Sequence, residues 1–158
     1  MSSLITQRLI TFARNEFRLD WDGIHGAPHW SRVRHNGLLL AKHTGANVRV
    51  VEYFAFIHDL GRWNDHHDPE HGDRAAAIAE NIAGDLIELA ADELDLLTEA
   101  CRGHSDGHTL ADVTVMTCWD ADRLDLGRVG IRPHPERLCN EVARHPEFIS
   151  TAYLRSLT

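Results

Sequence analysis

The residues best suited to chemistry are an adjacent imidazole and carboxylate, His58 and Asp59, which follow a dense apolar run from Val50 to Ile57. Such a run predicts a buried helix, and a polar pair at its end is costly to bury unless another group compensates it. Neutral imidazole nitrogen and ionised carboxylate oxygen are both good ligands for first-row transition metals. The pair therefore predicts a divalent metal site, provided that further ligands lie elsewhere in the chain.

Histidine is frequent in this chain of 158 residues, with 12 in total. Six of them lie between positions 58 and 108, namely His58, His66, His67, His71, His104 and His108. They are dispersed rather than consecutive, which favours a metal site over a tag. The three cysteines, Cys101, Cys118 and Cys139, are odd in number and far apart, so we expect small buried residues and no disulfide framework.

Helical periodicity predominates, and no convincing alternating strand pattern or internal repeat is found, so we expect an all-α bundle of about six to eight helices. The first three expected helices run from a Ser2 or Ser3 cap to about Phe17, from Pro28 to Thr44 before Gly45, and from an Asn47 cap to His58 and Asp59. A long polar loop is expected over 61–73. The later helices are expected over about 74–83, 92–102 with Asp92 as cap, 110–122, 136–144 and 147–157.

Further candidate ligands lie on two other expected helices. His29 opens one face of the second helix, and Asp122 lies near the end of the sixth. Together with His58 and Asp59 they would supply two imidazoles and two carboxylates, a set that suits Mn, Fe, Co, Ni or Mg and leaves positions for water or substrate. Asp120 competes with Asp122, because residues two apart point to different faces of a helix.

Three segments, in this order, resemble the HD-domain superfamily of metal-dependent phosphohydrolases. They are His25-Gly26-Ala27-Pro28-His29-Trp30-Ser31-Arg32-Val33, the doublet His58-Asp59, and Ala121-Asp122-Arg123-Leu124-Asp125. The resemblance covers about residues 25–131 and implies a single HD domain over 1–158, with C-terminal helices at about 134–157. It implies one metal held by His29, His58, Asp59 and Asp122. Asp122 is preferred to Asp120 because the family pattern places this ligand immediately before a basic and an apolar residue.

Some HD proteins bind a second metal through additional histidines. The resemblance makes His71 and His104 the candidates here, with Asp59 able to bridge two ions. Each of the two is equally well interpreted as a loop residue, or as one that supports a ligand. A bound metal would activate water for hydrolysis of a nucleotide or another small phosphate ester.

Arg62 lies where related proteins often carry a basic residue just after the doublet, and it can hold the substrate phosphate. The alternative is an ion pair with Asp65 or Glu52. Asp65, His66 or His104 can relay a proton to the leaving group. The expected catalytic residues are therefore Asp59, Arg62 and His104.

Two other functions remain open on the sequence. A di-iron oxygenase of the HD type would require both His71 and His104 as ligands. A regulatory module would keep the metal without the chemistry. The Glu-Asp pair that follows the doublet in alarmone hydrolases is absent, as are the longer motifs of cyclic-di-GMP phosphodiesterases and deoxynucleotide triphosphohydrolases, so these activities are disfavoured.

Composition limits the partners. A net charge of −8 without a dense basic run argues against polymeric nucleic acid, which requires a basic surface. No segment approaches the roughly 20 apolar residues that span a bilayer, and the N-terminus lacks a basic leader with an apolar core. We therefore expect a cytoplasmic protein that binds a small phosphorylated substrate and no membrane, with the oligomeric state open and a homodimer possible.

Overall fold

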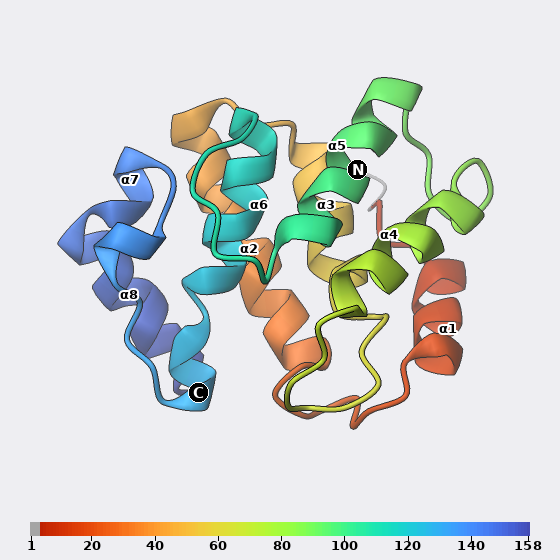
Figure 1. The fold of residues 1–158 in the computed structure, drawn as a ribbon, viewed down its shortest axis with the longest axis horizontal. Coiled ribbons are helices and arrows are strands. Elements are labelled where there is room, and N and C mark those ends of the chain that lie inside the picture. The colour runs from red at the N-terminus through yellow and green to blue at the C-terminus, as the bar shows by residue number, and fades with distance from the viewer. Residues whose placement is uncertain (1–3) are drawn as a thin grey trace.

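A computed structural model describes residues 4–158 and confirms the all-α fold. In this range the chain forms eight α-helices and two short 3-10 helices, and no strand beyond one isolated bridge between Ala83 and Ile87. The central bundle consists of α2 (Ala27–Thr44), α3 (Val48–Ile57), α5 (Ala91–Gly103) and α6 (Val113–Arg123). Figure 1 shows α7 (Glu141–Arg144) and α8 (Pro146–Ser156) on one side of this bundle, and α1 (Gln7–Glu16) and α4 (His71–Ile82) on the other.

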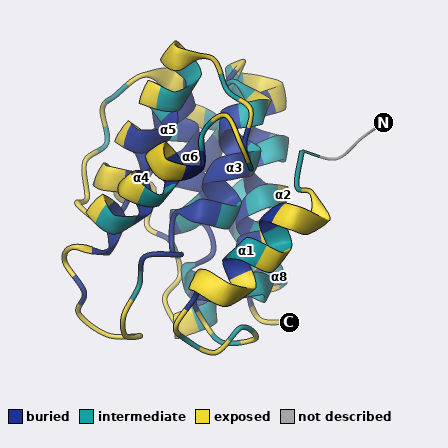
Figure 2. Ribbon diagram, turned by 90° about the vertical axis from the view of Figure 1, so that its right-hand side faces the viewer, coloured by how far each residue is buried: buried dark blue, intermediate teal, exposed yellow. Residues whose placement is uncertain are grey.

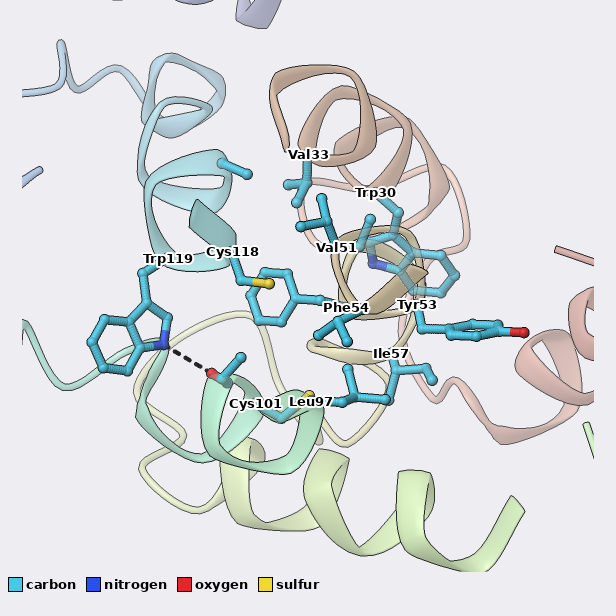
Figure 3. Close-up of a cluster of buried hydrophobic side chains, with 14 of the residues drawn as sticks. Trp30, Val33, Val51, Tyr53, Phe54, Ile57, Leu97, Cys101, Cys118 and Trp119 are labelled. Carbon is cyan, nitrogen blue, oxygen red and sulfur yellow. Dashed lines mark hydrogen bonds between the residues drawn. The ribbon is translucent and has the colours of Figure 1, made fainter. Parts of the chain in front are cut away.

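Helix α3 occupies the centre, as its apolar density predicts. Val50, Phe54 and Ile57 have no exposed surface, and α3 carries the buried colour in Figure 2. Around Phe54, side chains of α5 and α6 complete the core, and the Trp119 indole donates a hydrogen bond to the Ala100 carbonyl at 3.0 Å (Figure 3). Cys101 and Cys118 are buried free thiols, and Cys139 is a half-buried one. The expectation of buried cysteines without a disulfide is thus confirmed for Cys101 and Cys118.

The limits of α2 and α3 agree with the sequence prediction because their end residues have clear physical roles. Gly45 ends α2 in the left-handed conformation, with φ of 76°, which glycine adopts without a steric penalty. Asn47 caps α3, since its side-chain oxygen accepts hydrogen bonds from the Arg49 and Val50 amides. These two ends place His29 near the start of α2 and His58 directly after α3.

Several predicted helix starts were wrong. Thr6 caps α1, with its hydroxyl accepting from the Leu9 amide, whereas Ser2 and Ser3 lie outside the described residues. Helix α5 begins at Ala91, and Asp92 lies within its first turn because Glu93, not Asp92, bonds the free Ala90 amide. Helix α6 begins only at Val113, where Asp112 accepts from the Thr114 amide.

Two further segments differ from the prediction. Helix α4 begins at His71 rather than at residue 74, so the polar loop is shorter and His71 lies on a helix. The predicted helix over 136–144 is interrupted: a 3-10 turn, η2 (Pro135–Arg137), precedes the short α7, and another, η1 (Leu126–Val129), follows α6. The interruption occurs because the amides of Cys139 and Asn140 donate to the Asp120 carboxylate instead of to a helix.

Among the helices of residues 4–158, none combines the length and apolar character that crossing a bilayer requires.

Candidate metal centre

Four of the predicted ligands meet where α2, α3 and α6 converge. The Nε2 atom of His29 lies 3.1 Å from His58 Nε2, 3.4 Å from Asp59 Oδ2 and 3.1 Å from Asp122 Oδ1. His58 Nε2 in turn lies 3.2 Å from Asp59 Oδ2 and 3.5 Å from Asp122 Oδ1. Both imidazoles are fully buried and Asp59 nearly so. We call these four residues the first ligand set.

A second group forms on the other oxygen of Asp59. The Oδ1 atom lies 3.6 Å from His71 Nε2 and 3.4 Å from His104 Nε2, and the two Nε2 atoms are 2.8 Å apart. His71 comes from the first turn of α4, and His104 directly follows α5. We call Asp59, His71 and His104 the second ligand set. Each of the triads His29–His58–Asp59 and Asp59–His71–His104 can hold a metal ion.

The orientation of all four imidazoles is fixed by hydrogen bonds at Nδ1. His58 Nδ1 faces the carbonyls of Phe54 and Ala55 at 3.0 and 3.1 Å, and His104 Nδ1 faces that of Cys101 at 2.7 Å. Carbonyl oxygens only accept, so these Nδ1 atoms carry the proton. His71 Nδ1 donates in the same way to the Asp68 carbonyl at 2.5 Å.

His29 differs in that its Nδ1 partner is a carboxylate. Asp125 Oδ2 accepts from His29 Nδ1 at 2.6 Å, and its other oxygen accepts from Arg32 Nε at 2.7 Å. A carboxylate or carbonyl behind the ring is the usual support of a metal-binding histidine, because it fixes the tautomer and the ring orientation. In this structure every candidate histidine has such a support.

These tautomers favour a positive charge between the facing Nε2 atoms. A neutral imidazole protonated at Nδ1 presents a lone pair at Nε2, so the two facing pairs, His29 with His58 and His71 with His104, bring lone pairs within 3.1 and 2.8 Å. Facing lone pairs repel at these distances, and the carboxylate of Asp59 adds negative charge beside them. A proton or a metal cation between the nitrogen atoms removes the repulsion.

The pKa values of the cluster reflect the same preference for positive charge. Burial lowers the pKa of His58, but the carboxylates of Asp59 and Asp122 outweigh burial and raise it to about 10. Burial raises the pKa of Asp59, yet the His58 charge and bonds from the other imidazoles bring it well below its usual range. For His71, burial lowers the pKa to about 4, so this ring is neutral and ready to act as a ligand at pH 7.

The spacing of donor atoms fits coordination. Two neighbouring ligands about 2.1 Å from one cation stand about 3.0 Å apart in octahedral and about 3.4 Å apart in tetrahedral coordination. The donor separations given above run from 3.1 to 3.5 Å in the first ligand set and from 2.8 to 3.6 Å in the second. Donor type, tautomer and spacing therefore all suit divalent cations.

The structure distinguishes Asp122 from Asp120. Asp122 Oδ1 points into the first ligand set, whereas Asp120 is fully buried on another face of α6. There its carboxylate accepts from the Cys139 amide at 2.6 Å and the Asn140 amide at 2.8 Å, which anchors the segment before α7. Asp120 thus has a structural role away from the cluster.

The other predicted polar residues surround the cluster without joining it. Arg62 Nε lies 3.4 Å from Asp59 Oδ1, and its Nη1 donates to the carbonyls of Asn64 and His66. It pairs with neither Asp65 nor Glu52. Asp65 instead bonds His25 Nδ1 at 2.7 Å, and the His66 side chain belongs to an exposed loop residue.

A cavity of about 260 Å³ opens onto the cluster. Its lining includes Asp59, His71, His104 and Asp122, so the cavity reaches both ligand sets. The remaining lining residues are Arg62, Ser105, Gly107, Arg123, Leu126, Arg128 and Arg137. The cavity is therefore lined by acidic residues and histidines at the cluster and by four arginines around it.

Sequence reasoning missed four of the residues that shape this site. Asp125, which supports His29, lies three positions after Asp122, a spacing that places it near the same side of the chain. Arg123, Arg128 and Arg137 line the cavity. They lie in the last turn of α6 and in or beside the two 3-10 helices, and no spacing signal connects them before the fold is known.

Comparisons with protein-family models, curated proteins and solved structures find no match for this chain.

Proposed function

We propose that the two ligand sets bind two divalent cations that share Asp59, and that the protein is a metal-dependent phosphohydrolase of the HD type acting on a small phosphate ester. The observation that carries this proposal is the pair of facing imidazole couples, each with an oxygen of Asp59, next to a cavity that Asp59, His71, His104 and Asp122 line. Mn, Fe, Co or Ni would suit this mixture of imidazole and carboxylate, and Mg the carboxylates.

In this proposal each residue has one role. The first ligand set would hold one cation and the second ligand set the other. Bound cations supply Lewis acidity, which lowers the pKa of water and offsets charge on phosphoryl oxygens. Asp125 positions His29, and the backbone carbonyls behind the other three rings position them.

Arg62 would bind the substrate. Its guanidinium lies beside Asp59 in the cavity lining, and two loop carbonyls hold it in place. A planar guanidinium donates two parallel hydrogen bonds to phosphoryl oxygens, so it would orient the ester against the cluster. His104 would be a ligand rather than the proton relay, because both of its ring nitrogens are engaged.

The test is phosphate release by the purified protein supplied separately with Mn²⁺, Fe²⁺, Co²⁺, Ni²⁺ and Mg²⁺. Glycerol 3-phosphate, p-nitrophenyl phosphate and AMP are suitable substrates. We expect hydrolysis with at least one metal. His58→Ala and Asp122→Ala should each contain less bound metal and hydrolyse the ester about 100-fold or more slowly. His35→Ala, which removes an exposed imidazole of α2, is the matched control. Full metal content in both ligand variants would contradict the ligand assignment.

A di-iron oxygenase is the second candidate, favoured by one observation. His71 and His104 both direct Nε2 toward Asp59, which this function requires. Oxygen consumption by the Fe²⁺-loaded protein, without phosphate release from any ester, would support the oxygenase over the hydrolase. Metal binding without either activity would instead support a regulatory module.

A further inference from the structure

The cavity above the cluster carries more positive charge than one phosphoryl group requires. Four arginines contribute to its lining, Arg62, Arg123, Arg128 and Arg137, in a chain whose net charge is −8. Arg62 is partly balanced by Asp59 at 3.4 Å. The other three form no ion pair with a carboxylate anywhere in residues 4–158.

Arg123 is the most unusual of the three. Only 8% of its surface is exposed, and its Nη2 atom is buried without a hydrogen-bond partner in the described part of the chain. Its Nη1 donates to the Arg137 carbonyl at 2.8 Å, and the guanidinium carbon lies 5.5 Å from the Trp119 ring centre. A buried guanidinium with an unsatisfied N–H group is costly, so an anion that reaches it would relieve the cost.

Arg128 and Arg137 line the same cavity as Arg123 and add positive charge to it. Arg128 is held by the carbonyls of Ile24 and Asp125, at 2.8 and 2.9 Å, which are neutral acceptors and leave its charge unbalanced. The side chain of Arg137 is exposed and donates no hydrogen bond among the described residues. Carbonyl anchoring fixes Arg128 in position in advance, which lowers the entropy lost when an anion binds.

We infer that the substrate carries a second anionic group, a phosphate or a carboxylate, which Arg123, Arg128 and Arg137 bind while the reacting phosphoryl group lies at the cluster. This inference rests on the proposed function. The cavity volume of about 260 Å³ lies below the roughly 300–1,000 Å³ of sites for drug-sized ligands. Among its lining residues there is no Phe, Tyr or Trp on which a base could stack. A compact molecule with two anionic ends fits these features better than a nucleotide.

The test compares two non-hydrolysable probes with the same phosphonate head. Phosphonoacetate carries a second anion and methylphosphonate does not, and calorimetry on the Mn²⁺-loaded protein measures their affinities. We expect phosphonoacetate to bind at least tenfold more tightly. Arg137→Gln and Arg123→Gln should each bring the ratio close to one. Arg132→Gln is the matched control, because Arg132 is exposed, bonds Ser150 and does not line the cavity.

Equal affinity of the two probes for the unmodified protein, or an unchanged ratio in Arg137→Gln, would overturn the inference. Arg137 is exposed, so this variant gives a result even where Arg123→Gln fails to fold. Methylenediphosphonate in place of phosphonoacetate distinguishes a second phosphate from a carboxylate. The inference and the proposed function can fail separately. Tenfold tighter binding of phosphonoacetate without hydrolysis of any ester would support the second anion site and contradict the hydrolase. Hydrolysis of esters with equal affinity for the two probes would support the hydrolase and contradict the second anion site.

Discussion

At the scale of single residues, the candidate centre depends on which ring nitrogen carries the proton. Backbone carbonyls behind His58, His71 and His104 and a carboxylate behind His29 place the Nδ1–H of each ring on the outer side of the cluster. The Nε2 lone pair of each neutral ring therefore points inward. Of these supports, Asp125 is the one whose side chain can be changed without altering the backbone.

Asp125→Asn should weaken cation binding by the first ligand set. An amide can still accept the His29 hydrogen bond, but it loses the charge that makes the imidazole a stronger ligand, and Arg32 loses its partner. We expect a loss of about 10- to 100-fold in affinity for one of the two cations. Competition titration against a metal indicator measures it. Asp85→Asn, which alters an exposed pair with Arg8, should leave both affinities unchanged, and equal affinities in all three proteins would contradict this role.

The choice between Asp120 and Asp122 illustrates what residue types alone leave open. Both are aspartates near the end of α6, and both carboxylates contact residues distant in the sequence. The rotation of α6 about its axis points Asp122 toward His29 on α2. Asp120 points to another side of α6, where the amides of Cys139 and Asn140, which follow η2, donate hydrogen bonds to it. The second contact links residues 19 and 20 positions apart, which no local pattern encodes.

At the scale of helices, the second ligand set depends on a close approach between α4 and α5. A Cβ atom at Gly72 would lie 2.5 Å from the Cys101 carbonyl oxygen and 2.9 Å from that of Arg102. Glycine therefore lets the first turn of α4 lie directly on the end of α5. This contact brings His71 to His104. The sequence prediction placed Gly72 in a loop, because residues 61–73 are polar and contain few helix formers, and a packing contact of this kind is not visible in periodicity.

Gly72→Ala should separate the two helices. We expect a loss of about 1–3 kcal/mol in the free energy of unfolding, measured by urea denaturation, because the added methyl group overpacks a buried contact. The variant should also bind one cation less, by elemental analysis. Ile82→Val, at the far end of α4, costs about 0.5–1.5 kcal/mol and is the control for stability alone. Full metal content in Gly72→Ala would show that the close approach is not needed for the second ligand set.

At the scale of the whole molecule, the all-α architecture and the central position of α3 follow from helical periodicity and apolar density. His29, His58, Asp59 and Asp122 were also identified from the sequence as neighbours, and the fold brings them within 3.5 Å contacts. Helix starts were less predictable, because caps such as the Glu93 contact with Ala90 depend on side-chain geometry. The grouping of Arg123, Arg128 and Arg137 at the cavity could not be predicted, since these arginines come from separate turns.

We propose that one buried aspartate, Asp59, joins two cation sites. A crystal structure of the Mn²⁺-loaded protein, with anomalous scattering recorded at the manganese edge, tests it most directly. We expect two anomalous peaks, one among His29, His58, Asp59 and Asp122 and the other among Asp59, His71 and His104, each on a different oxygen of Asp59. Anomalous density at only one of these positions, or at neither, would contradict a shared Asp59.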